Sequence, residues 1–388
     1  MTYDAITIDT QTVYANGRSL DRGLVGQLEQ YKDGLVKLVL SEIVVREIRA
    51  MLVTKAKATA DALSKAIKDG ESNGQLTAEQ VTILKGLNDG LASPEDHATE
   101  QLKRFIDATR AHIVAADKAP MKEILRAYFG KRAPFSSRGK KDEFPDAISL
   151  LALEAWAKEE NKKILAVSND GDWRAFAQQS EWIDCIQDLA SGMSRVVAAA
   201  ESAEAMGRTL LMKIIGGNAT ELKQIIDDDL RREIELLTPY AEFDGPMHGE
   251  DEGATLSLID YVIEEAESDK TEITIVRVRS DGFVMRIPIL VHALASADIH
   301  FSIYDSIDKD YVPMGSTSVE REIDFEAFAL IDCDVIQTSE GSPDQPSEIN
   351  VTSVELIGAP QYIDLGYVDY SLADEDVDFD PDELSETN

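Results

Sequence analysis

The sequence predicts an α/β domain built around a parallel sheet and, after it, a mostly β domain. In the first half of the chain, short apolar segments that read as strands alternate with helical segments, which is typical of a parallel sheet with helices on both faces. One of those helices, DAISLLALEAWA, is apolar almost all round and should be buried. Beyond residue 254 the pattern changes to the alternation of apolar and polar residues found in antiparallel strands.

Four strands are expected in the α/β domain, and a long helix follows the second. This helix begins at Ser41, a residue type that caps helix N-termini well. Residues 98–128 also read as helical, and Pro145 suits the first position of the buried helix. The expected strands are AITID (5–9), VKLVL (36–40), ILAVS (164–168) and WIDCI (182–186).

Four segments follow from this pattern. The Pro-, Gly- and acid-rich stretch at 239–254 is the best linker, and nothing beyond it has a ligand fingerprint. The expected segments are an α/β domain over 1–190 with a helical insert at about 50–130, a helical bridge and linker over 191–250, a mostly β domain over 251–367, and an acidic, disordered tail over 368–388.

Composition indicates a water-soluble protein of the reducing cytoplasm. No apolar run approaches the ~18 residues of a membrane span, and the N-terminus does not resemble a secretory signal. The two cysteines, Cys185 and Cys333, suggest neither a disulfide framework nor a metal-ligand spacing. We therefore expect a cytoplasmic location and no membrane partner.

Charge is distributed very unevenly. The net charge of −35 at first argues against a nucleic-acid partner. The tail after Val368, however, holds nine carboxylates and no base, whereas residues 121–141 hold seven bases and one acid. The average charge therefore hides a basic patch.

Several carboxylates fall where an α/β sheet forms its sites, beyond the C-terminal ends of the strands. Asp9 closes the first strand, Asp170 and Asp172 follow the third, and Asp146 lies in the first turn of the buried helix. Taken singly, each is more simply explained as a capping or solvated acid. Together they would converge on one edge of the sheet.

Helical geometry adds Glu47 to this group. At 100° per residue, Glu47 lies about 60° from Val44, at the border of the apolar stripe, while Glu42 lies about 160° away on the opposite face. Grouped carboxylates suit Mg²⁺ or Mn²⁺, which take oxygen ligands and can activate water for phosphodiester cleavage. The five histidines form no motif, which speaks against zinc.

Four motifs in order resemble the PIN family of metal-dependent ribonucleases, in particular a PIN-like group with a long helical insert that is otherwise a domain of unknown function. The resemblance covers about residues 3–190, and no single motif is diagnostic. The motifs are IDTQTVY (8–14), SEIVVREI (41–48), KKDEFPDAISLLAL (140–153) and ILAVSNDGDWRAF (164–176). The chain departs from this family at two positions, with Gln11 where asparagine or a small residue is common and Trp173 where phenylalanine is more usual. Neither removes a ligand, although Gln11 bears on hydrogen bonding in the pocket.

The resemblance implies a PIN-like, flavodoxin-like sandwich and a nuclease site. Its catalytic and metal-binding acids would be Asp9, Glu47, Asp146 and Asp170, with Asp172 assisting. Members cleave RNA with Mg²⁺ or Mn²⁺, and many act as toxins, in RNA maturation or in antiviral defence.

The basic stretch before Asp146 could meet RNA phosphates. Tyr128, Phe129 or Phe135 could stack on an unpaired base, or could simply pack in the core while the bases are solvated. Asp142 or Glu143 could serve as an outer-shell acid. The candidate substrate-binding residues are Arg132, Arg138, Lys140 and Lys141.

The expected function is a divalent-metal-dependent endoribonuclease, as a toxin or defence effector. The alternatives are a DNA or flap nuclease of the same fold and a non-catalytic interaction scaffold. The β domain could bind an inhibitory or sensing protein, and a homodimer is possible.

Overall fold

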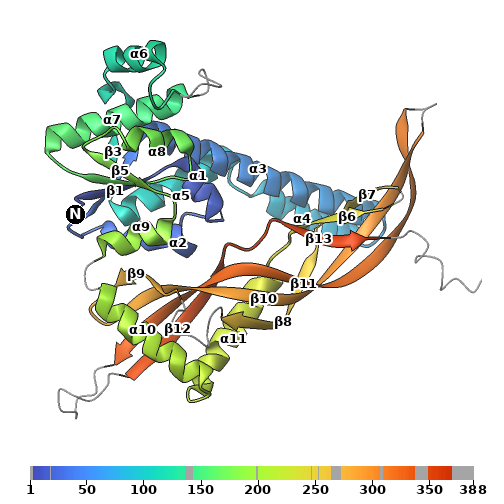
Figure 1. The fold of residues 1–388 in the computed structure, drawn as a ribbon. Coiled ribbons are helices and arrows are strands. Elements are labelled where there is room, and N and C mark those ends of the chain that lie inside the picture. The colour runs from blue at the N-terminus through green and yellow to red at the C-terminus, as the bar shows by residue number, and fades with distance from the viewer. Residues whose placement is uncertain are drawn as a thin grey trace, which may run out of the picture. The chain divides into compact units, whose positions relative to one another are not determined.

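The computed structural model describes residues 3–17, 19–135, 143–197, 200–245, 247–251, 253–263, 272–305, 309–336 and 348–368. The chain divides into two compact units (Figure 1). Unit 1 comprises residues 1–205 and 274–285, and unit 2 comprises residues 206–273 and 286–388. Three expected substrate-binding residues, Arg138, Lys140 and Lys141, and the acidic tail from residue 369 lie outside the described residues.

Unit 1 is built on a five-stranded parallel sheet with the strand order β3-β2-β1-β4-β5. The expected parallel α/β fold is thus confirmed, and all four expected strands are present. The fifth strand, β3, was not predicted. The strands are β1 (Ala5–Ile8), β2 (Lys37–Ser41), β3 (His112–Val114), β4 (Ile164–Val167) and β5 (Ile183–Ile186).

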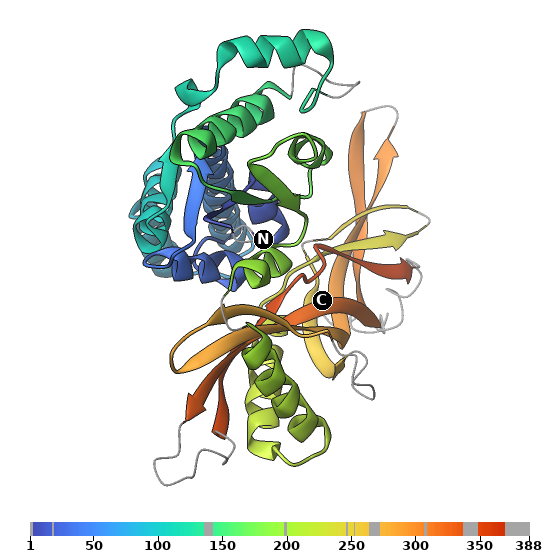
Figure 2. The same cartoon turned by 60° about the vertical axis from the view of Figure 1, so that its left-hand side comes forward.

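Helices cover both faces of this sheet, with α7 and α9 on opposite sides of it in both views (Figures 1 and 2). The helices from the N-terminus through the one that follows β5 are α1 (Thr10–Ala15), α2 (Gly23–Gly26), η1 (Gln27–Tyr31), α3 (Glu42–Ser72), α4 (Ala78–Asp89), α5 (Pro94–Thr109), η2 (Ala116–Lys118), α6 (Met121–Gly130), α7 (Phe144–Glu160), α8 (Gly171–Ala177) and α9 (Leu189–Val196).

Local sequence explains where several of these helices begin and end. The Ser41 side chain accepts a hydrogen bond from the backbone N–H of Ile43, so Ser41 caps α3 as predicted. The expectation of one helical stretch over 98–128 was wrong. Arg110 adopts a left-handed conformation (φ 50°) that ends α5, and β3 and η2 intervene before α6 begins after Pro120.

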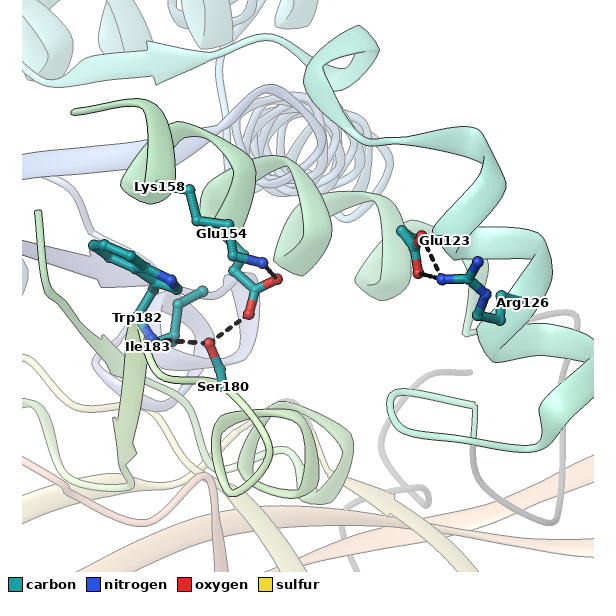
Figure 3. A network of polar contacts seen from close by, with 7 residues as sticks. All are labelled: Glu123, Arg126, Glu154, Lys158, Ser180, Trp182 and Ile183. Carbon is teal, nitrogen blue, oxygen red and sulfur yellow. Dashed lines mark hydrogen bonds and ion pairs between the residues drawn. The ribbon is translucent and has the colours of Figure 1, made fainter. Parts of the chain in front are cut away.

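Helix α7 is buried as predicted, and a polar network links it to the start of β5 (Figure 3). The hydroxyl of Ser180 donates to Glu154 on α7 and accepts from the backbone N–H groups of Trp182 and Ile183 at the start of β5. Lys158 donates to the same carboxylate at 2.6 Å. The network fixes α7, and hence the acid in its first turn, against the sheet.

Unit 2 is mostly β, which confirms the expected C-terminal β region. Its main sheet pairs β10 with β7 and β8, and β11 with β12, all antiparallel. A separate parallel pair joins β6 and β13. The helices and strands that follow α9 in the chain, most of them in unit 2, are α10 (Ala200–Ile215), α11 (Thr220–Glu235), β6 (Tyr240–Asp244), β7 (His248–Asp251), β8 (Thr255–Ile263), β9 (Thr274–Val278), β10 (Gly282–Asp305), β11 (Asp310–Ile336), β12 (Glu348–Ile357) and β13 (Tyr362–Tyr367).

A hairpin from this second half of the chain belongs to unit 1. Strand β9 and the first residues of β10 cluster with the parallel-sheet unit, and β9 packs against α9 and η1. The side chain of Gln30 donates to the carbonyl of Val276 at 2.9 Å. Among the helices described, none is long and apolar enough to cross a membrane.

Candidate active site

The candidate site lies where β1 and β4 end side by side. These neighbours run parallel, with Ile8 in register with Val167, so the loops that follow them leave from the same edge. Strand β2 flanks β1 on its other side, so connections diverge at this point of the sheet. Open α/β sheets bind their ligands at such a switch point.

Asp9, the residue after β1, is buried at this edge with 4% of its surface exposed. One carboxylate oxygen accepts from the backbone N–H and the hydroxyl of Thr12, both at 2.6 Å. The other accepts from the hydroxyl of Ser168, just past β4. Burial raises the pKa of Asp9, although the hydrogen bonds from Ser168 and Thr12 oppose the rise. Asp9 therefore has a fixed orientation.

Asp146 lies in the first turn of α7 and carries the largest perturbation among these acids. Burial, and then the negative charges of Asp170, Glu47 and Asp9, raise its pKa to about 6, while a hydrogen bond from Trp173 acts in the opposite direction. That bond runs from the indole Nε1 of Trp173 to Oδ1 of Asp146 at 2.9 Å. The other three carboxylates therefore act on Asp146 electrostatically.

Glu47 reaches the site from α3. The hydroxyl of Thr10, one residue past Asp9, donates to its carboxylate at 2.6 Å. Glu42 is directed elsewhere, because its carboxylate accepts from the backbone N–H of Ala116 at 2.9 Å and pairs with Arg46. These contacts favour Glu47 over Glu42 as the helix acid of the site.

Asp170 and Asp172 follow β4, and Glu143 accompanies them. Asp170 caps α8 by accepting from the backbone N–H of Asp172 at 2.6 Å, and its other oxygen accepts from the side chain of Gln11 at 3.3 Å. Partial burial, then Glu143 and then Asp170, raises the pKa of Asp172. Glu143, the residue before α7, is buried. It thus lies close to Asp172, as an outer acid would.

The acids gather around a shared region without forming a closed coordination sphere. Within the described part of the chain, no three His, Cys, Asp or Glu side chains stand in a group that could hold an ion. Carboxylates that repel one another are expected to stand apart until a cation offsets their charge. The donors present are all oxygens, which suits a hard cation.

Two other features of unit 1 are not part of this site. Burial, followed by the charge of Asp9, raises the pKa of the Cys185 thiol to about 11, so it is not a nucleophile at neutral pH. A cavity of about 400 Å³ lies among α3, α5 and the segment before η1, lined by Leu52, Ala56 and Phe105 among others. None of the predicted site residues lines this cavity.

The one expected substrate-binding residue that is described, Arg132, is exposed and follows α6. Its backbone N–H donates to the carbonyl of Ala127, which keeps it next to the end of that helix. Arg132 therefore lies on a surface element rather than in the acidic cluster.

A parallel sheet of this strand order, with carboxylates gathered at its switch point, defines an α/β domain with an acidic, oxygen-lined site. Residues 6–173 match the family model described as PIN domain, which supports a PIN-family domain in this part of the chain. PIN domains are generally nucleases and so act on nucleic acid. The match includes all five predicted acids. No curated protein and no solved structure matches the chain.

Proposed function

We propose that unit 1 is a divalent-metal-dependent endoribonuclease whose site is formed by Asp9, Glu47, Asp146 and Asp170, with Asp172 assisting. The observation that supports this most is the environment of Asp146, whose pKa is raised to about 6 by burial and by three other carboxylates of the set. A scaffold gains nothing from a buried carboxylate whose pKa is raised by other negative charges, whereas such an arrangement prepares a site for a cation.

Mg²⁺ or Mn²⁺ fits the residues present, because every donor is an oxygen and the group carries excess negative charge. Such an ion supplies an activated water and offsets the charge of the phosphate oxygens. The protein's own contribution is orientation. Ser168 and Thr12 hold Asp9, Thr10 holds Glu47, and Trp173 holds Asp146.

The experiment that tests the proposal is cleavage of labelled single-stranded RNA, structured RNA, single-stranded DNA and a flap substrate, in Mn²⁺, Mg²⁺ or EDTA. We expect metal-dependent cutting of RNA that Asp146→Asn abolishes. Because α3 offers a matched pair, Glu47→Gln should also abolish cutting while Glu42→Gln leaves it unchanged, since Glu42 binds Ala116 and Arg46 instead.

The possible outcomes separate the candidate functions. Cutting of DNA or flaps with RNA left intact would replace the endoribonuclease by a DNA nuclease of the same fold. Silence on every substrate, with no Mn²⁺ binding by calorimetry, would instead indicate an interaction scaffold.

As a toxin or defence effector, an active endoribonuclease would arrest the growth of a host cell that expresses it. Expression of the wild type should therefore reduce colony formation, and Asp146→Asn should restore it at equal protein level. Equal growth of the two strains would argue for a processing role.

A further inference from the structure

The surface of α6 is unusual in an acidic protein. Met121, Leu125 and Phe129 recur every four residues, and each is exposed, Phe129 by 77%. At 100° per residue they lie within an arc of about 80°. Only Ile124 of this helix is buried, so α6 turns an apolar stripe outward. Lone exposed apolar residues are common, but a continuous stripe indicates a binding surface.

Cations lie along one side of the stripe and at the end of the helix. On the same helical wheel, Lys122 and Arg126 lie about 20° and 60° beyond Phe129. Lys131 and Arg132 follow at the end of the helix, and all four are exposed. The single acid of residues 121–135, Glu123, is paired with Arg126 at 2.7 Å (Figure 3). Residues 121–135 therefore carry a net positive charge in a chain of net charge −35.

The aromatic residues near α6 divide into a packed group and one exposed ring. Phe135 is buried and packs edge-on against Tyr128 and Phe144, with ring centroids 5.3 and 5.1 Å away. Phe129 contacts only the edge of Tyr128 among the rings described, at 5.2 Å. Of the three aromatics that could stack on a base, Phe129 alone is as exposed as stacking requires.

The same aromatic group connects α6 to the acidic site. Tyr128 packs on Phe144 with ring centroids 5.1 Å apart, and Phe144 opens α7 two residues before Asp146. In both views α6 lies on the outer side of α7, away from the sheet (Figures 1 and 2). A strand that crosses α6 would therefore pass close to the end of α7 that carries the site acid.

We propose that α6 binds single-stranded RNA, with Phe129 stacking on an unpaired base and Lys122, Lys131 and Arg132 meeting phosphates, and that it guides the strand to the acidic site. This inference rests on the proposed nuclease function. An exposed ring beside cations is the combination that binds single strands, since every base offers a face for stacking and every nucleotide a phosphate. Phe129 is a positioning residue and touches no reacting atom.

The test is fluorescence anisotropy of a labelled, unstructured 12-nucleotide RNA with the full chain in EDTA, which prevents cleavage. We expect Phe129→Ala to weaken binding about tenfold, because base–aromatic stacking contributes substantially to single-strand affinity. Phe129→Tyr keeps the ring and should bind within about twofold of the wild type. The matched control is Leu87→Ala, which removes another exposed apolar side chain, from α4 (65% exposed).

Salt dependence tests the cations separately. Each phosphate contact on a single strand adds about 0.7 to the slope of log K against log salt, so Arg132→Gln should lower the slope by about that amount. In Mn²⁺, Phe129→Ala should raise KM for the 12-nucleotide RNA and leave kcat within about twofold, as loss of positioning predicts.

Equal RNA affinity of Phe129→Ala and wild type would overturn the proposal. Two other measurements on Phe129→Ala could also overturn it. If RNA affinity is unchanged and only the sedimentation of the protein differs, α6 serves self-association. If RNA affinity is unchanged and only binding to anionic vesicles is lost, α6 serves a membrane surface. Failure of the nuclease proposal is distinct, because it abolishes cleavage and leaves the EDTA binding measurement intact.

Discussion

Removing the charge of Asp146 while keeping its shape should stabilise the metal-free protein. In Asp146→Asn the amide oxygen can still accept the hydrogen bond from Trp173, so packing is preserved. What the substitution removes is a carboxylate that is partly buried and faces three other negative charges. We therefore expect an inactive variant that is more stable than the wild type in EDTA.

The magnitude follows from the pKa. Burial and the neighbouring acids raise the pKa of Asp146 from 3.8 to about 6, and each unit corresponds to about 1.4 kcal/mol, which gives at most about 3 kcal/mol. Because the side chain retains some access to water, we expect about 1–2 kcal/mol. Because the pKa is higher in the folded protein than in the unfolded chain, protonation of Asp146 stabilises the fold. This stabilisation is fully present below pH 3.8 and is lost as the pH rises through about 6.

The assay is denaturant unfolding followed by tryptophan fluorescence at pH 4 to 8. All three tryptophans, Trp156, Trp173 and Trp182, lie in unit 1, so the signal reports the unit that contains the site. The variant and the wild type should be equally stable near pH 4 and should diverge up to pH 7. Excess Mn²⁺ should reverse the order, because bound metal stabilises only the form that binds it.

Two results would refute this reasoning. If Asp146→Asn is already more stable than the wild type at pH 4, the added stability does not come from removing a charge. A wild type that is as stable as the variant in EDTA at pH 8 would show that the four carboxylates do not repel one another there. Glu42→Gln is the control, since its pKa is lowered by Ala116 and Arg46 and its removal should not stabilise the protein.

Three further predictions concern other contacts. Trp173→Phe should remove the hydrogen bond that lowers the pKa of Asp146, so Mn²⁺ affinity measured by calorimetry near neutral pH should fall while the fold, followed by circular dichroism, persists. In unit 2, burial and then Asp227 raise the pKa of Tyr261 above its usual 10, so wild-type stability should fall as the pH rises beyond 10, and Tyr261→Phe should show a smaller fall in alkaline denaturation curves. Gly192→Ala would place a methyl 2.8 Å from a valine side chain of β4, so it should lower the free energy of unfolding by about 1–3 kcal/mol in urea titrations.

The acids at the strand ends could be predicted from the sequence because their positions depend only on the course of the backbone. Parallel strands end at a common edge, so Asp9 and Asp170 had to come close once the two strands were recognised. Glu47 needed only the helical period. Strand β3 was missed because three residues, HIV, lie between polar helices, and only pairing with β2 makes them a strand.

The long strands of unit 2 show a different limit. The alternation of apolar and polar residues beyond residue 254 indicates strands but does not give their lengths, and β10 runs without interruption over Gly282–Asp305. The small residues near its middle, Ala295 and Ala297, carry little apolar signal of their own. These alanines are nevertheless buried on the same face of the strand as Ile289, Val291 and Ile299, because every second residue is buried. A single strand therefore continues through them. The membership of β9 in unit 1 likewise depends on contacts far apart in the chain.

Side-chain orientation at the site is the part that sequence comparison could not supply. Within the PIN resemblance, Trp173 stands where phenylalanine is more usual, and the two rings fill a buried position similarly. They differ by one N–H donor, and in this protein that donor binds Asp146, the acid with the most perturbed pKa of the group. This departure therefore changes the hydrogen bonding of a proposed metal ligand, and the consequence is visible only when α7 and α8 are placed side by side.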